Sequence, residues 1–316
     1  MLKTKKTPRD LKLFYPLVQN DLIEIIAPGS SAPPENLEKG EAVLRSWGLQ
    51  VQYDPEMLKP DMYLSNSDAY RFNAFKKAMT NPKVKGIWCL RGGYGANRLL
   101  PLIEKMKVPR MQKLLIGFSD VTSLHQILNQ KWNWPSLHGS LIDRLAAGSL
   151  SPENLKELRE SLFESPTKIL FSNLIPLNKF AKKKKVIKAK LVGGNLLVVT
   201  SSIGTPSQIK TKGRILFFEE IAERAYRVDR CLQQLKQANL LINVEAVVFG
   251  DFTRCEESDG KDLIHQTLIN FFSELKIPAF MGLQVGHGQV QRPLFLNTPN
   301  VLTCGANPKL VNYGPL

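Results

Sequence analysis

Apolar runs that alternate with amphipathic helix patterns dominate the first half of the chain. An apolar run at 22–29 precedes helical spacing over 36–48, and a second run at 84–90 precedes a helix pattern at 97–106. Strands joined by helical crossovers lie parallel and carry helices on both faces, so the alternation predicts an α/β domain with a mostly parallel sheet. Functional residues in such a domain gather at the carboxyl ends of the strands.

Length and a change of pattern predict a second domain. The 316 residues exceed the roughly 100–200 residues that are usual for one domain. The pattern loosens into a stretch rich in Pro and Lys, and strand patterns resume at 214–220 and 246–252. We therefore expect an N-terminal α/β domain over 1–150, a linker over 151–190, and a smaller C-terminal α/β domain over 191–316.

Composition argues against several classes of protein. No apolar run reaches the ~18–20 residues of a membrane span. The basic N-terminus lacks the apolar core and the small-residue cleavage site of a signal peptide, so export is unsupported. The four cysteines are scattered, without a CxxC pair or a histidine at zinc spacing. We expect a cytoplasmic protein with neither a disulfide framework nor a structural zinc site.

The chain is strongly basic, with a formal net charge of +15. Its densest basic run, AKKKKVIKAK at 181–190, has no interleaved aromatic residues on which bases could stack. Such runs also occur as localisation or heparin-type patches. A solvated linker is the favoured interpretation, and nucleic acid is not an expected partner.

One serine lies at a junction that suits a nucleophile. In LLIGFSDVTSLH, Ser119 follows an apolar strand pattern and precedes a helix pattern. A hydroxyl on such a turn lies above the sheet edge, near backbone amides that can stabilise an oxyanion. The alternative is a plain helix N-cap. This segment alone favours the cap, because Val121 stands where the G-x-S-x-G elbow has its second glycine.

A nucleophilic serine needs a base. His125 falls within the helix after the serine, and His265 falls in another amphipathic helix. His138 and His287 each follow an apolar strand and compete as candidates, with a plain loop histidine as the alternative for both.

A carboxylate usually orients the base. Glu219 and Glu220 end the apolar strand pattern RILFFEE and are candidates for this carboxylate, although two acids at a plain exposed strand end would give the same pattern. The glycine-rich stretch LRGGYGANRLL, residues 90–100, is neither of the common nucleotide-binding patterns. A loop that offers backbone donors to a substrate carbonyl fits it as well.

Taken together, the motifs resemble those of the LD-carboxypeptidases (muramoyltetrapeptide carboxypeptidases) and the related microcin C self-immunity hydrolases. The resemblance covers nearly the whole chain. It rests on eight motifs in the family's order: IIAPGSSAP, LRGGYGANRLL, IGFSDVTSLH, LHGS, LVGGNL, ILFFEEIAERAYRVDR, FGDFTRC and VGHG.

The resemblance implies roles for five residues. Ser119 corresponds to the nucleophile, Glu219 to the carboxylate that orients the imidazole, and His287 to the general base. Gly93 and the amide of Asp120 correspond to the oxyanion hole. The order Ser, Glu, His implies an active site in the cleft between the two domains.

The resemblance also implies a reaction. A serine peptidase of this family releases the terminal D-alanine from muropeptide tetrapeptides in peptidoglycan recycling, through an acyl-enzyme and without metal or cofactor, and is expected to be a homodimer. The substrate's carboxylates need cationic partners, and Arg71, Arg91 and Arg227 remain open as candidates. Tyr94 and Asn195 are further candidates for substrate binding, together with Arg91.

Two other functions remain open. An immunity-type hydrolase of peptidyl-nucleotide amide links would need an aromatic clamp for the nucleobase, for which the expected linker offers Phe171 and Phe180. A basic binding protein on an inactive peptidase scaffold is the third hypothesis, and the intact Ser119, Glu219 and His287 count against it. The second acid of the pair, Glu220, stands where the family usually has Asp.

Overall fold

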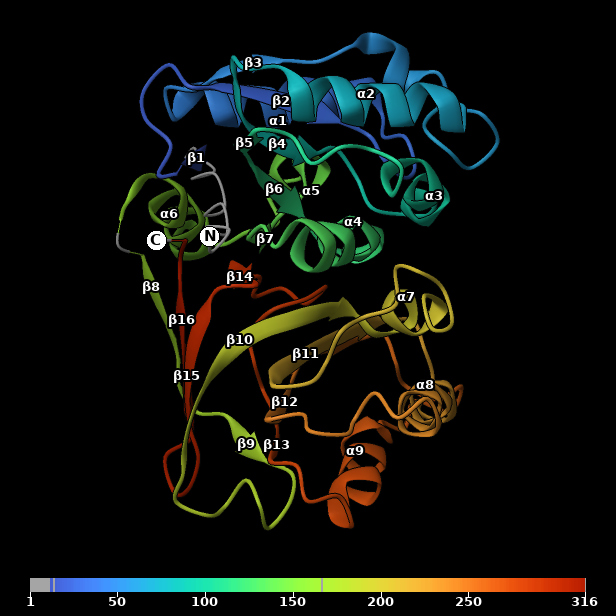
Figure 1. The fold of residues 1–316 in the computed structure, drawn as a ribbon, viewed down its shortest axis with the longest axis vertical. Coiled ribbons are helices and arrows are strands. Elements are labelled where there is room, and N and C mark those ends of the chain that lie inside the picture. The colour runs from blue at the N-terminus through green and yellow to red at the C-terminus, as the bar shows by residue number, and fades with distance from the viewer. Residues whose placement is uncertain (1–11, 14, 166, 316) are drawn as a thin grey trace, which may run out of the picture.

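The computed structural model describes residues 12–13, 15–165 and 167–315. Residues 1–11 of the basic N-terminal segment lie outside the described residues. Two sheets lie one above the other along the longest axis, with the N-terminal half of the chain at the top of Figure 1 and most of the C-terminal half below. Among the described residues, none of the helices combines the length and the apolar character that crossing a membrane requires.

The upper sheet has six strands in the order β14-β7-β6-β4-β2-β3. Its parallel strands are β2 (Leu22–Ile26), β3 (Gln50–Gln52), β4 (Val84–Cys89), β6 (Leu114–Gly117) and β7 (Ser136–His138). β14 (Leu294–Leu296) is antiparallel to β7. The predicted α/β architecture with a mostly parallel sheet is confirmed.

Helices cover both faces of this sheet because successive strand side chains point to opposite sides. In β4, Trp88 packs into a core with α1 (Pro34–Ser46) and α5 (Ile142–Ala146). Its neighbours Ile87 and Cys89 pack on the other side, against α2 (Asp68–Thr80), α3 (Leu100–Ile103) and α4 (Thr122–Ile127). The apolar run is therefore buried on both faces, as expected for a central parallel strand.

Short elements complete this half. The strands β1 (Lys12–Leu13) and β5 (Met111–Gln112) pair with each other. Short 3₁₀ turns and one π turn link the longer elements: Pro55–Leu58, Ala96–Leu99, Ser119–Val121 and Leu128–Trp132.

The lower sheet has eight strands in the order β8-β16-β15-β10-β11-β12-β13-β9. Its parallel centre consists of β10 (Val186–Asn195), β11 (Arg214–Ile221), β12 (Ala246–Thr253) and β13 (Ala279–Met281). β15 (Pro299–Thr303) and β16 (Lys309–Tyr313) add antiparallel pairing. One face is covered by α7 (Leu196–Ser201), α8 (Ala225–Gln237) and α9 (Ile264–Ser273).

Residues 151–190 do not form the linker that the sequence analysis expected. They carry α6 (Pro152–Phe163), β8 (Lys168–Phe171), β9 (Ile175–Pro176) and the first residues of β10, and all three strands join the lower sheet. Ile187 is buried between exposed neighbours, including Lys188. The Lys-rich composition suggested a solvated linker, but the start of β10 alternates apolar and charged residues as a strand.

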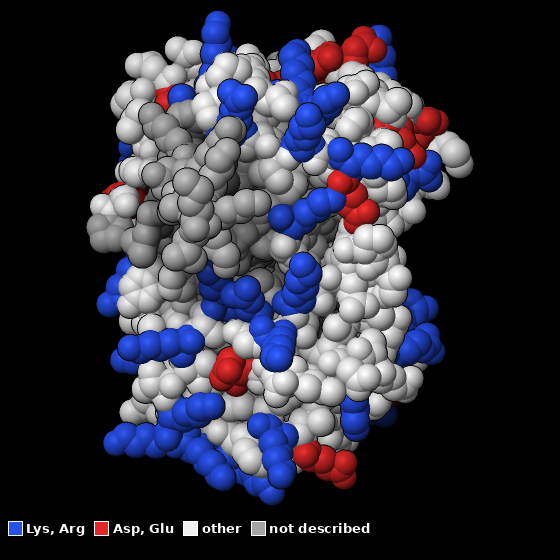
Figure 2. All heavy atoms as spheres, viewed as in Figure 1, with Lys and Arg blue, Asp and Glu red and all other residues white. Residues whose placement is uncertain are grey.

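The basic side chains themselves are on the surface. Lys182 to Lys185 are all exposed, in the turn before β10. Lys and Arg are scattered over both halves of the face drawn in Figure 2 and are not gathered into one stripe.

The two halves are joined by more than a single passage of the chain. β14, from the C-terminal half, forms the edge of the upper sheet by pairing Leu294 with His138. Just before it, the Arg292 guanidinium contacts the Glu157 carboxylate of α6 through two nitrogens, at 2.8 and 2.5 Å. The loop between β13 and β14 is therefore anchored to the N-terminal half of the chain at its β14 end.

Candidate active site

Ser119 lies at a sharp turn between β6 and α4. β6 ends at Gly117, and Ser119 has a backbone φ of 65°. A left-handed conformation is uncommon for a residue other than glycine, because the Cβ crowds the following carbonyl. The flanking Phe118 and Val121 are buried in the same core and hold the turn in place.

The N-cap alternative for Ser119 is wrong. The 3₁₀ turn and α4 both begin without a side-chain cap, and no described residue forms a hydrogen bond with the Ser119 hydroxyl. The side chain is half-buried, and its oxygen is available for another partner.

The glycine-rich turn lies directly against this serine. A Cβ atom on Gly92 would lie 2.9 Å from the Ser119 Cβ and 3.1 Å from its Oγ. Gly93 has a φ of 76°, and a Cβ atom there would lie 2.3 Å from the Ser30 Oγ. Both positions need glycine for the close approach. The Gly92 carbonyl accepts from the Ser30 amide at 3.0 Å, which fixes the direction of that peptide.

Two backbone amides near Ser119 are available as donors. Among the described residues, the amides of Gly93 and Asp120 donate to no other backbone or side-chain group. The Asp120 carboxylate points into the turn and accepts from the Ala96 amide at 2.8 Å. Burial raises the pKa of Asp120 to about 6, although hydrogen bonds from the Ala96 and Gly95 amides act in the opposite direction.

Glu219 and His287 form a close pair on the other side of the site. Glu219, on β11, is completely buried, and the His287 Nδ1 donates to its Oε2 at 2.6 Å. A hydrogen bond to an ionised carboxylate is among the stronger kinds in proteins. It fixes the ring orientation and leaves Nε2 as the nitrogen able to accept a proton.

Glycines on both sides of His287 allow its loop to pack closely. A Cβ atom on Gly286 would lie 3.1 Å from the Oε2 of Glu219, and one on Gly288 would lie 2.6 Å from the Oδ2 of Asp251. Burial raises the pKa of Asp251 to about 6. Asp251 was not among the predicted site residues, although it lies in the FGDF motif at the end of β12.

Phe118, the residue before Ser119, contacts His287. The ring of Phe118 lies edge-on to the His287 imidazole, with 4.7 Å between centroids. A hydrogen bond joins Glu219 to His287, and Ser119 directly follows Phe118, whose ring contacts His287. No hydrogen bond joins Ser119 to His287 in the described chain.

The structure separates the two competing histidines. His138 is completely buried, with its Nε2 4.0 Å from the Oε1 of Glu219. Burial, followed by the nearby His125 and His287, holds the pKa of His138 well below its ordinary value. The His287 side chain is 12% exposed and therefore accessible from the surface. His138 is instead a neutral residue behind the carboxylate.

The two adjacent acids have different environments because the strand pairing is irregular there. The register between β11 and β12 shifts between Phe218 and Glu220, and such a bulge can re-aim side chains. Glu220 accepts from the Asn195 Nδ2 at 2.7 Å and from the Leu197 and Ile221 amides at 2.8 and 2.9 Å. Burial raises its pKa to about 7, with a further contribution from the charge of Glu219.

The side chain of Asn195, a predicted substrate contact, is bonded within the fold. Its side-chain oxygen caps α7 by accepting from the Val198 amide at 3.1 Å, and its nitrogen donates to Glu220. The residue is 5% exposed. Its polar atoms are used within the fold.

The arginine candidates also differ. Arg71 is buried and fully occupied by contacts within the N-terminal half. Arg227 lies on α8, where it pairs with Glu223. Arg91 and Tyr94 flank the glycine pair of the turn and are exposed, and Arg91 is 3.6 Å from Asp143. Of the proposed substrate contacts, these two remain available.

The clamp residues considered for a nucleobase are not both accessible. Phe171 is 2% exposed and belongs to the core, and Phe180 is half-buried beside Lys179 and Lys183. An exposed aromatic pair lies elsewhere, where the ring of Tyr94 contacts that of Tyr63 with 5.5 Å between centroids. Within the described ranges, no group of three or more His, Cys, Asp or Glu side chains is arranged to hold a metal ion.

Known proteins are similar to almost the whole chain. Residues 23–139 match the LD-carboxypeptidase N-terminal domain, and residues 188–302 match the LD-carboxypeptidase C-terminal domain. A putative carboxypeptidase of Rickettsia conorii is 37% identical over 298 residues, covering 93% of this chain and 91% of that protein.

Two further comparisons concern proteins with more specific names. The crystal structure of muramoyltetrapeptide carboxypeptidase from Oxalobacter formigenes superposes with a TM-score of 0.81 at 30% identity, covering 93% of this chain and 99% of that one. The microcin C7 self-immunity protein MccF of Escherichia coli is 24% identical, with 87% of this chain and 88% of that protein covered.

Proposed function

Since the chain belongs to the LD-carboxypeptidase family, we propose that it is a serine peptidase that releases the terminal D-alanine from muropeptide tetrapeptides. The observation that carries the proposal is the Glu219–His287 hydrogen bond beside a serine held at a φ of 65°. The substrate is inferred from the names of similar carboxypeptidases, and the role in peptidoglycan recycling is inferred from that substrate.

The geometry supports an acyl-enzyme mechanism. The Ser119 oxygen attacks the scissile carbonyl while the His287 Nε2 takes its proton. Glu219 stabilises the imidazolium that forms, and the amides of Gly93 and Asp120 donate to the oxyanion. His287 then protonates the departing D-alanine amine. Water, activated by His287, releases the shortened peptide from Ser119.

The substrate's terminal carboxylate needs a cation near the turn. Arg91 is the proposed partner because its side chain is 47% exposed and lies next to Gly92 in the chain. Tyr94 extends the same surface. We further propose that the protein acts in the cytoplasm as a homodimer, and that it needs neither a metal nor a cofactor.

A second candidate is an immunity-type hydrolase of peptidyl-nucleotide amide links. Similarity to the microcin C7 self-immunity protein favours it, and the exposed rings of Tyr63 and Tyr94 could stack on a nucleobase. The same catalytic residues would serve either substrate. The two candidate functions therefore differ in the part of the substrate beyond the scissile amide, which is a D-alanine in one and a nucleotide in the other.

The experiment compares both substrate classes on the purified protein. A diaminopimelate-containing tetrapeptide and an aminoacyl sulfamoyl adenosine are incubated separately, and the products are identified by mass spectrometry. The proposal expects release of D-alanine from the tetrapeptide and little cleavage of the nucleotide. Cleavage of the nucleotide alone would establish the second candidate. Turnover of neither, together with salt-dependent retention on nucleic acid, would favour a binding protein.

A further inference from the structure

We propose that Arg71 is a positioning residue that sets the geometry of the oxyanion hole, an inference that rests on the proposed serine mechanism. The hole is formed by amides of the glycine-rich turn and of the residue after Ser119. Arg71 does not touch the reacting atoms. Its effect is to hold the turn at the distance from Ser119 that the reaction requires.

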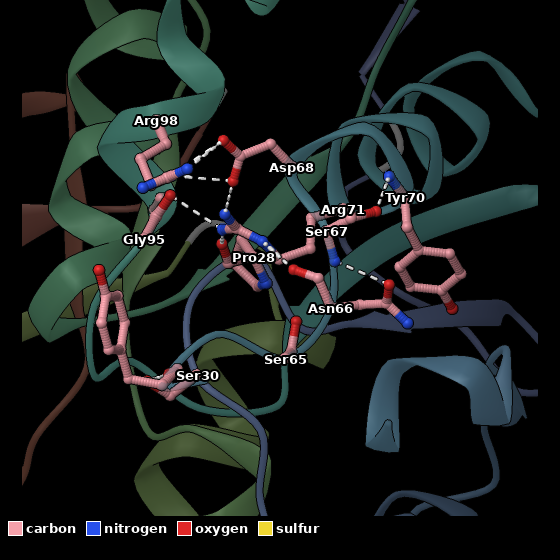
Figure 3. Close-up of polar contacts among 12 residues, drawn as sticks. Pro28, Ser30, Ser65, Asn66, Ser67, Asp68, Tyr70, Arg71, Gly95 and Arg98 are labelled. Carbon is pink, nitrogen blue, oxygen red and sulfur yellow. Dashed lines mark hydrogen bonds and ion pairs between the residues drawn. The ribbon is translucent and has the colours of Figure 1, made fainter. Parts of the chain in front are cut away.

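Arg71 joins three separate segments of the N-terminal half. From α2, its Nη1 donates to the Gly95 carbonyl at 2.9 Å and also to the Pro28 carbonyl, and its Nε donates to the Asn66 carbonyl at 3.0 Å. Its Nη2 pairs with Asp68. Figure 3 shows the guanidinium at the centre of these groups, with Gly95 on one side and Asn66 on the other.

One peptide group of the turn is held from both sides. The Gly95 carbonyl accepts from Arg71, while the amide of the same peptide, which belongs to Ala96, donates to the Asp120 carboxylate at 2.8 Å. The plane of this peptide cannot rotate without losing one of the two bonds. Since Asp120 directly follows Ser119, the turn is fixed relative to the nucleophile.

The remainder of the turn leads from this peptide to the serine. The Tyr94 amide donates to the Ser30 Oγ at 3.2 Å, and the same hydroxyl donates to the Tyr63 carbonyl at 2.8 Å. Gly92 lies against Ser119. The amide of Gly93, which lies between Gly92 and Tyr94 in the chain, has no partner among the described residues. The peptides around that amide are bonded, so its direction is determined by the turn.

The charge of Arg71 is balanced within the cluster. Its side chain is completely buried, which is costly for a cation unless a partner and hydrogen bonds compensate. Asp68 supplies the charge and is shared with the exposed Arg98 at 2.8 Å. The planar fork of arginine reaches several carbonyls in different directions, which a lysine ammonium at the same place does not reproduce.

The test measures how fast Ser119 reacts with a fluorophosphonate probe. The Ser119 oxygen forms a bond to phosphorus, fluoride leaves, the serine proton passes to His287, and the phosphoryl oxygen occupies the oxyanion hole. The variants are Arg71→Met, Arg71→Lys and Asp68→Asn. Lys113→Met is the matched control, because Lys113 is also completely buried and donates to carbonyls at the far end of α2, Ala78 and Asn81.

Removal of one oxyanion-hole donor typically lowers kcat by about 10²-fold or more. Arg71→Met is expected to slow labelling and kcat by about that factor with KM changed little, Arg71→Lys to recover part of the rate, and Asp68→Asn to lose less. Lys113→Met is expected to lower stability without slowing the label.

Wild-type labelling rates in folded Arg71→Met would overturn the proposal, as would an equal loss in Lys113→Met at matched stability. If Arg71→Met does not fold, wild-type rates in both Arg71→Lys and Asp68→Asn would overturn it. The probe needs no muropeptide, so these results are separable from the substrate assignment. Failure of the wild-type protein to label at Ser119 would instead overturn the proposed mechanism itself.

Discussion

At the scale of single residues, Ser119 holds a conformation that the fold imposes on it. Its φ of 65° places the hydroxyl away from the helix amides and beside the glycine-rich turn. Such backbone strain is common at active sites, where it orients reactive groups. The sequence could suggest Ser119 from its place between strand and helix, but sequence spacing alone does not specify a positive φ.

Replacing Ser119 with glycine or alanine separates chemistry from strain. Both variants lose the nucleophile and are expected to show no turnover. Glycine adopts a positive φ readily, so Ser119→Gly is expected to be more stable than Ser119→Ala by about 1 kcal/mol. Urea unfolding of the two proteins checks this, and equal midpoints would contradict the claim that this turn is strained.

Glu219 is hydrogen-bonded to the proposed base His287 and is not itself the proposed nucleophile, so its amide variant is expected to remain folded and partly active. Glu219→Gln preserves the shape of the side chain but favours the wrong tautomer of the imidazole. By analogy with the serine protease triad, we expect kcat to fall by roughly 10³–10⁴-fold with KM nearly unchanged. Steady-state kinetics checks this. A loss confined to KM would show that Glu219 binds substrate instead.

At the scale of elements, β11 carries two adjacent acids near its end, and the two have different partners. Periodicity predicted the strand, but it did not predict the irregular pairing that buries both Glu219 and Glu220. The same limitation applied to β10, whose alternating Lys residues resembled a solvated linker. The irregularity in β11 depends on its pairing with β12, and β10 is recognised as a strand only through its pairing with β11 and β15. Neither feature could be derived from local sequence.

The raised pKa of Glu220 has a consequence for stability. Its pKa is about 7 in the folded protein, above its ordinary value, so between pH 4.5 and 7 the folded state binds the proton more tightly than the unfolded state. This contribution is present at low pH and is lost as the pH rises. The neutral Glu220→Gln lacks this dependence.

The stability of Glu220→Gln relative to the wild-type protein is therefore expected to improve from pH 5 to pH 8. Urea unfolding at the two pH values gives the comparison. A stability difference that does not change with pH would contradict the assigned burial effect.

At the scale of the whole molecule, the site depends on both halves of the chain. Ser119 comes from the upper sheet, and Glu219 and His287 come from the lower sheet and the loop that leads to β14. The sequence order of the motifs, read with the family resemblance, predicted this sharing. It did not predict the return of β14 to the upper sheet, because pairing between distant strands has no local signature.

This return of the chain predicts that the two halves unfold together. A fragment over 1–165 would lack β14, expose the edge of β7, and leave uncovered a core that the two sheets share. We expect the full chain to show one unfolding transition by both near- and far-ultraviolet circular dichroism, and the fragment to aggregate or bind a hydrophobic dye. Two separate transitions in the full chain would contradict this.

The central claim is that Ser119 carries the acyl group during turnover. The most direct measurement is an acid quench of the wild-type protein during turnover of the tetrapeptide, followed by peptide mapping by mass spectrometry. We predict that the peptide containing Ser119 gains the mass of the substrate acyl group without D-alanine, and that Ser119→Ala neither gains this mass nor releases D-alanine. Release of D-alanine by Ser119→Ala at the wild-type rate would contradict the account.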